Sequence, residues 1–102
     1  MDPQIISITH QLIPQYFDKI SEDLKAAQDQ EALKQKLTPI IAFYLDHDFE
    51  RFLQILYRID IDENKFKMAL QMENIAEEVT ELIIKRFIQK AEIRLRYGAS
   101  TH

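Results

Sequence analysis

The sequence predicts an all-α fold, a compact bundle of about five helices with a long helix at its C-terminal end. Apolar residues recur at intervals of three and four along most of the chain, which is the period of one helix face. The 102 residues include only 1 glycine and 3 prolines, too few turn-forming residues for a strand-rich fold. This length is typical of one domain, so a single helical domain is expected over residues 1–102.

The first predicted helix begins with Asp2 as its N-cap and Pro3 at its first helical position, where the missing N–H group costs nothing. Its apolar pattern continues to about Ala27, but Pro14 lies inside the pattern, on the polar side of the helix. A proline on the outer face can bend a helix without interrupting its apolar face. We therefore expect one bent helix to about Ala27, with a break at Pro14 as the alternative.

A second helix is expected to begin after its N-cap, Asp29, and to run to about Asp46. Pro39 lies inside it, and Thr38 and Pro39 could instead cap and begin a new helix. The apolar residues keep the same phase on both sides of Pro39, and this favours a single kinked helix.

The densest helical pattern of the chain lies in the stretch His47–Leu70. Asp48 is the expected N-cap of a helix that runs to about Ile59, and Asp62 is the expected N-cap of a shorter helix. The longer helix has an apolar face at i, i+3, i+4 and i+7, which consists of Phe49, Phe52, Leu53 and Leu56. Because Leu53 is expected in the core, Leu53→Ala should cost about 2–5 kcal/mol of stability.

Part of this stretch resembles small helical bacterial proteins of unknown function. The residues that carry the resemblance are Asp48, Phe49, Leu53, the run Leu56–Asp60, Glu63 and Lys65. A weaker similarity extends over Glu81–Arg86, so that the resemblance covers about half of the chain. It implies a helical fold, and it brings no catalytic residue and no ligand.

The last helix is predicted to run from Asn74 to Tyr97. Gly98, the one glycine of the chain, stands where a left-handed residue would end this helix, and residues 98–102 are expected to form a frayed tail. The apolar face of the helix rotates by roughly a quarter turn along its length. Its two halves should therefore pack against different parts of the protein.

The second half of the last helix has an apolar stripe, Ile84, Ile88 and Leu95, whose cover the sequence does not assign. Symmetric pairing of two copies through this stripe would give a homodimer. In that case Ile88→Asp should break the dimer and leave most of the helix content intact. The alternative is that the first helix covers the stripe within one chain.

The same half carries a basic row in which Arg86, Lys90 and Arg94 are aligned at i, i+4 and i+8. Such a row could follow the phosphates of a nucleic acid or another polyanion, which is the alternative function. The net charge of −4 disfavours nucleic-acid binding by the whole surface. Basic residues in the last turns of a helix also simply complement its dipole.

Two short patterns are typical of metal or proton chemistry. Asp60, Asp62 and Asn64 are spaced like the first ligands of a calcium loop, but Lys65 and Gln71 occupy the positions that need glycine and an acidic residue. In a second pattern, a histidine stands between two aspartates at residues 46–48, as a base or metal ligand would. Capping at helix ends is the better interpretation of both patterns.

Groups that could serve catalysis are sparse in the sequence. Tyr57 and Arg58 are the best candidates for buried polar side chains, with Arg58 placed to pair with Asp62, and a structural role is expected for them. The chain has no cysteine, no glycine-rich phosphate loop and no nucleophile next to a base. We therefore expect no catalytic residue, metal, cofactor or small-molecule substrate.

The sequence thus predicts a non-catalytic helical module that binds a protein partner or a second copy of itself. No secretion signal is visible and charges interrupt every apolar run, so neither export nor a membrane span is expected. The lack of cysteine fits a reducing compartment, and a cytoplasmic location is expected.

Overall fold

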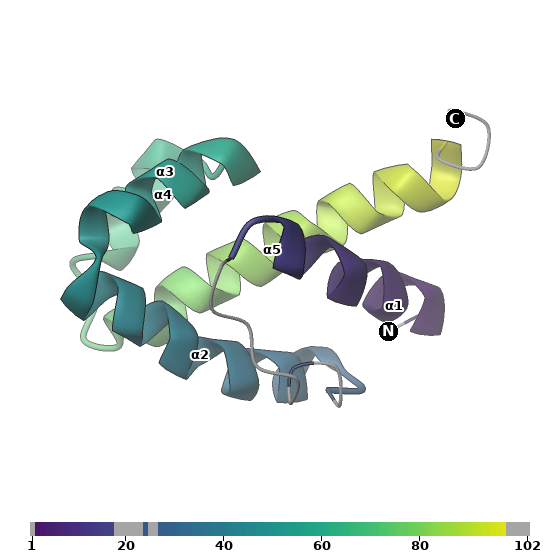
Figure 1. Ribbon diagram of the computed structural model, residues 1–102, viewed down its shortest axis with the longest axis horizontal. Coiled ribbons are helices and arrows are strands. Elements are labelled where there is room, and N and C mark those ends of the chain that lie inside the picture. The colour runs from purple at the N-terminus through teal and green to yellow at the C-terminus, as the bar shows by residue number, and fades with distance from the viewer. Residues whose placement is uncertain (1, 18–23, 25–26, 98–102) are drawn as a thin grey trace.

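Figure 1 shows the computed structural model of the protein, which describes residues 2–17, 24 and 27–97. All regular elements in this part of the chain are helical, so the all-α prediction is confirmed. They are α1 (Pro3–Leu12), the 3₁₀ helix η1 (Ile13–Gln15), α2 (Gln30–His47), α3 (Phe49–Ile59), α4 (Glu63–Ala69) and α5 (Ile75–Tyr97). The predicted long C-terminal helix is α5. Gly98 and the predicted frayed tail lie outside the described residues.

Aspartate side chains begin four of the five α-helices, at the positions that the sequence predicts. The carboxylates of Asp2, Asp29, Asp48 and Asp62 accept hydrogen bonds from backbone N–H groups two or three residues further on, at 2.8, 2.8, 3.4 and 3.1 Å. Each bond satisfies one of the N–H groups that a helix leaves without an internal partner. The start of a helix is therefore fixed by chemistry within a few residues.

Pro14 ends the first helix, and the single bent helix to about Ala27 is wrong. α1 stops at Leu12, and Pro14 lies in the 3₁₀ turn Ile13–Gln15 that follows. A proline has no N–H group to donate, and its ring clashes with the carbonyl group four residues earlier. The break near Pro14, which was the alternative, is what the structure has.

Pro39 has the opposite outcome, because α2 continues through it as one helix. The buried side chains of α2 lie on one face before and after the proline, and they are Leu33, Leu37, Ile41 and Tyr44. Pro39 itself is exposed. Burial of the apolar face on both sides offsets the hydrogen bond that Pro39 cannot donate.

The helix α5 is the centre of the bundle, since α1, α2, α3 and α4 all pack against it (Figure 1). A chain of aromatic rings runs through the core and links α2, α3, α4 and α5 with the residues that follow η1. Successive ring centroids are 5.6 Å apart for Tyr16–Phe87, 6.5 Å for Phe87–Phe17, 5.9 Å for Phe17–Tyr44, 5.8 Å for Tyr44–Phe52 and 6.4 Å for Phe52–Phe66. We call these six side chains the aromatic spine.

The buried face of α3 differs from the predicted one. Leu53 is 41% exposed and Phe49 is exposed to a similar degree, whereas Phe52 and Leu56 are buried as expected. The buried residues of α3 are Phe52, Ile55, Leu56 and Ile59. Because α3 packs on both α2 and α5, its core face is turned toward Ile55 and Ile59. The predicted cost of Leu53→Ala therefore does not apply to this side chain.

His10 gives the fold a pH dependence. Burial lowers the pKa of His10 below its ordinary value of 6.5, although a hydrogen bond with the backbone of Ala27 acts in the opposite direction. The imidazole of His10 therefore binds a proton less well in the folded chain than in the unfolded chain. The stability linked to His10 is complete above about pH 6.5 and is lost as the pH falls through 6.5 toward the lower, folded-state pKa.

Urea unfolding at about pH 7.5 and pH 5.5 tests this expectation. The native chain should lose stability between the two values, and His10→Gln should lose less. If both chains lose the same amount, His10 is not responsible for the pH dependence.

Candidate functional site

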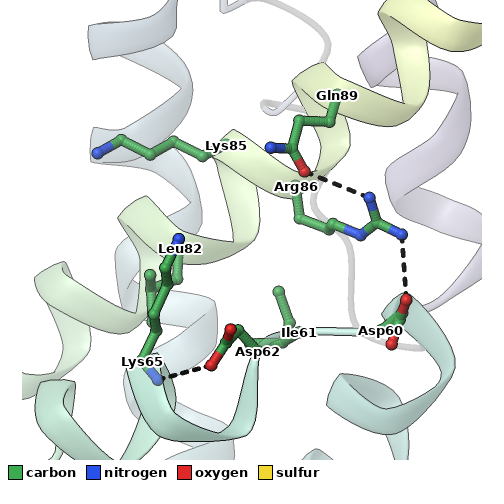
Figure 2. Close-up of a pocket in the computed structure, with 8 residues that line it drawn as sticks. All are labelled: Asp60, Ile61, Asp62, Lys65, Leu82, Lys85, Arg86 and Gln89. Atoms are coloured by element: carbon green, nitrogen blue, oxygen red, sulfur yellow. Dashed lines mark hydrogen bonds and ion pairs between the residues drawn. The ribbon is translucent and has the colours of Figure 1, made fainter.

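Arg86 joins α5 to the end of α3 (Figure 2). Its Nε donates a hydrogen bond to the carbonyl oxygen of Ile59 at 3.2 Å, and its two terminal nitrogens donate to Asp60 and Gln89, each at 3.3 Å. Ile59 is the last residue of α3, so its carbonyl group has no partner within the helix. Arg86 therefore supports the fold with groups that a bound phosphate would otherwise use.

Asp60 ends α3 in a left-handed conformation, with φ 68° and ψ 53°, and its N–H group donates to the carbonyl oxygens of Leu56 and Tyr57. It is the one residue other than glycine with positive φ in the described part of the chain. Aspartate tolerates this region better than most residues do, although glycine is the usual choice.

Substitutions at Asp60 should separate the conformational requirement from the ion pair with Arg86. Asp60→Ala is expected to lower the free energy of unfolding by about 1–2 kcal/mol, because Cβ disfavours the left-handed region. Asp60→Gly should stay within about 1 kcal/mol of the native chain, since the lost carboxylate is an exposed partner. Urea unfolding measures both, and equal losses in the two variants would show that the carboxylate matters more than the backbone.

The hollow in Figure 2 has a volume of about 410 Å³ and lies between α5 and the link from α3 to α4. Several of its charged residues are already engaged within the chain. Arg86 turns toward Asp60, while the side chain of Lys85 points away from Asp60. The Nζ of Lys85 lies 3.8 Å from a carboxylate oxygen of Glu81. The carboxylate of Asp62 accepts the N–H group of Lys65 at 3.1 Å. Because acidic and basic residues both line the hollow, it shows no clear selectivity for anions or cations.

A second and larger hollow, of about 670 Å³, lies between α3 and α4. We call it the α3–α4 groove. Its apolar lining consists of Leu53, Leu56, Tyr57, Ile61 and Phe66, and its other lining residues are Asp60, Asp62, Glu63 and Asn64. Tyr57 is 87% exposed, the most exposed of the large apolar side chains in the described residues. The charged residues of the groove are all acidic.

The apolar side of the groove continues along α3, because Phe49, Leu53 and Tyr57 follow one another at i, i+4 and i+8 and are all exposed. At 100° per residue, Glu50 lies about 60° from Leu53 around the helix, and the arginines of α3 lie about 140–160° away. The acidic residue of α3 therefore flanks this exposed stripe, and its two basic residues do not.

The prediction that Tyr57 and Arg58 are buried is wrong, since both side chains are exposed. The guanidinium group of Arg58 lies 5.2 Å from the ring centroid of Tyr16 and donates to the carbonyl oxygen of Gln15 at 3.5 Å. Arg58 thus reaches back to the segment after α1, and Tyr57 is directed to the groove. The i, i+4, i+8 spacing of the exposed stripe was the signal in the sequence that could have found it.

The stripe predicted for self-association is mostly part of the fold. Ile84 is 1% exposed in the core, and Ile88 is partly buried against the core. α1 packs along α5, as the alternative interpretation has it. Ile84 is therefore not a surface residue, and only Leu95 of the three is exposed.

The predicted basic row is also not one open surface. Arg86 makes the bonds described above, with its side chain 26% exposed. Lys90 is partly buried, and burial, followed by the nearby charge of Arg86, lowers the pKa of its amino group. Of the three, only Arg94 is an exposed residue. The row therefore has one exposed member.

Beyond this row, the last turns of α5 form a second exposed surface that is both apolar and basic. It consists of Ile93, Arg94, Leu95, Arg96 and Tyr97, all of which are exposed, and we call it the α5 tip. Ile93 is 53% exposed. In Figure 1 the α5 tip, drawn in yellow, and the α3–α4 pair lie at opposite ends of the long axis of the molecule.

The described residues offer neither a metal centre nor a membrane-spanning helix. They contain no cluster of three or more His, Cys, Asp or Glu side chains that could hold a metal ion. No described helix combines the length and the apolar character that crossing a membrane requires. Comparisons of the chain with protein families, with curated proteins and with solved structures found no match, so the resemblance to small bacterial helical proteins stays a prediction.

Proposed function

We propose that the chain is a non-catalytic protein-interaction module whose α3–α4 groove binds an amphipathic helix with basic side chains. The observation that carries the proposal is the exposure of Tyr57 and Leu53 next to an apolar groove. Contiguous exposed apolar surface with a polar rim is typical of protein-binding sites. Tyrosine is also among the residues that contribute most to such interfaces.

A helix is the expected shape of the partner. The groove lies between two helices, and the exposed residues of α3 repeat every four residues. An amphipathic helix places its own apolar side chains at three- and four-residue intervals, which matches this spacing. The partner would thus bury Leu53 and Tyr57 under its apolar face.

Basic side chains are expected around that apolar face because the groove is acidic. Asp60 is 85% exposed, and Glu63 is also largely exposed. Their pairs with Arg86 and Lys67 are ion pairs in contact with water, which contribute little free energy. Both carboxylates can therefore also interact with cations of a partner, which favours basic partners over acidic ones.

Polyanion binding by Arg86, Lys90 and Arg94 is the weaker proposal, since Arg86 already binds Ile59 and Asp60.

We assign no catalytic residue, and we place the protein in the cytoplasm, in agreement with its cysteine-free composition. In this proposal the function depends only on the apolar and acidic residues exposed at the α3–α4 groove.

Two labelled helical peptides of roughly 16 residues test the proposal, each with leucine at i, i+3, i+4 and i+7. One carries lysine and arginine at its remaining positions, and the other carries glutamate. Fluorescence anisotropy should show the basic peptide binding at least about tenfold more tightly, with a gap that narrows at high salt.

Variants of the chain place this binding on the groove. Tyr57→Ser should weaken binding of the basic peptide at least about tenfold, as loss of a central interface residue does. Met72→Ser, which changes an exposed apolar side chain outside the groove, is the matched control and should bind normally. Equal binding of both peptides, or no effect of Tyr57→Ser, would refute the proposal.

A further inference from the structure

We infer that the partner helix of the α3–α4 groove is the α5 tip of a second copy of this chain, so that copies associate head to tail. The inference rests on the proposed function, because it names the partner of the same groove. The α5 tip is itself a helix end with exposed apolar and basic side chains. It therefore has the chemistry that the groove is expected to bind.

The arrangement of side chains on the α5 tip fits the groove. Ile93 and Tyr97 are four residues apart and lie on one side of the helix. Arg94 and Arg96 lie about 80° to either side of the line between them, given 3.6 residues per turn. An apolar ridge with a cation on each flank can place its ridge on Tyr57 and its cations near the acidic groove residues.

The groove cannot bind the tip of its own chain. The two surfaces lie at opposite ends of a molecule whose longest extent is 39 Å, and α5 is a continuous helix between them (Figure 1). The contact must therefore join two copies. Each copy then offers one groove and one tip. Contact between these two different surfaces is a heterologous interface, and such contacts either close into a ring of copies or extend into a longer assembly.

Symmetric pairing of two α5 helices is disfavoured by the same observations. In a parallel arrangement it would bring Arg94 and Arg96 of one copy close to those of the other, and like charges at an interface are unfavourable. Ile84, which was expected to contribute to such pairing, is buried in its own chain. Contact between the α5 tip and the acidic groove brings opposite charges together instead.

The solution mass of three chains tests the inference. Light scattering behind size exclusion, at about 10 µM and 500 µM, should show the native chain above its monomer mass of 12.1 kDa at the higher concentration, as expected for a weak interface. Tyr57→Asp removes the groove contact and Ile93→Asp removes the tip contact. Each variant alone should be a monomer, with unchanged helix content by circular dichroism.

Mixing the two variants gives the decisive result. The intact tip of Tyr57→Asp can still bind the intact groove of Ile93→Asp, so the mixture should form a complex of twice the chain mass, with no larger species. Met72→Asp is the matched control and should associate like the native chain. If the mixture stays monomeric, or if the native chain is monomeric at both concentrations, the inference is overturned.

The peptide experiment separates this inference from the proposed function. A monomeric native chain that still binds the basic peptide would retain the proposed function and exclude a second copy as the partner. A chain that binds neither would exclude both. If the inference holds, the basic peptide should also dissociate the native assembly, because peptide and α5 tip compete for one groove.

Discussion

Phe52→Ala is expected to lower the free energy of unfolding by about 3–5 kcal/mol, the usual cost of removing a buried aromatic side chain. Phe52 is fully buried, and its ring contacts those of Tyr44 and Phe66 in the aromatic spine. Its loss would open a cavity where α2, α3 and α4 meet. Domains of this size have a total stability of about 5–15 kcal/mol, so the variant should be close to unfolding.

Urea unfolding followed by circular dichroism measures this loss, and Leu53→Ala is its matched control. Leu53 is the next residue of the same helix, but because it is partly exposed its truncation should cost less than about 1 kcal/mol. A larger loss for Leu53→Ala than for Phe52→Ala would mean that α3 is rotated relative to the arrangement described above.

Ile84→Asp is expected to prevent folding, with a loss of more than about 4 kcal/mol. The side chain of Ile84 lies in the core, where an aspartate would place a charge without a partner among apolar groups. Circular dichroism of the purified chain should show loss of most helix content and no cooperative thermal transition.

Leu95→Asp is the control for this substitution, since it adds the same charge to the same helix at an exposed position. It should keep the native helix content and melt within a few degrees of the native chain, given that about 1 kcal/mol corresponds to 4–8 °C in a domain of this size. Normal folding of Ile84→Asp would return Ile84 to the surface and revive symmetric pairing through α5.

The sequence predicts the helix starts well because each depends on local chemistry. An aspartate that caps a helix bonds to an N–H group two or three residues away, so a short window of sequence contains both partners. Pro14 and Pro39 are harder to tell apart, because whether a helix survives a proline depends on what the rest of the chain packs against it.

The buried face of α3 shows why the candidate site could not be fully predicted. Two sets of four residues fit the i, i+3, i+4, i+7 spacing there, one that includes Leu53 and one that includes Ile55, and they share Phe52 and Leu56. Their centres differ by about 60° around the helix. The choice between them depends on how α2 and α5 approach, which is set by residues far away in sequence. The exposed stripe and the groove follow from that choice.

The central position of α5 has a consequence for the order of events during synthesis on the ribosome. Among the described helices α5 comes last along the chain, and α1, α2, α3 and α4 all pack on it. Phe87, which connects Tyr16 to Phe17 in the aromatic spine, lies within it. A growing chain therefore exposes the apolar faces of α1 to α4 until α5 has emerged. The core of this bundle can therefore close only after α5 has been synthesised, and α1 to α4 have to wait for it.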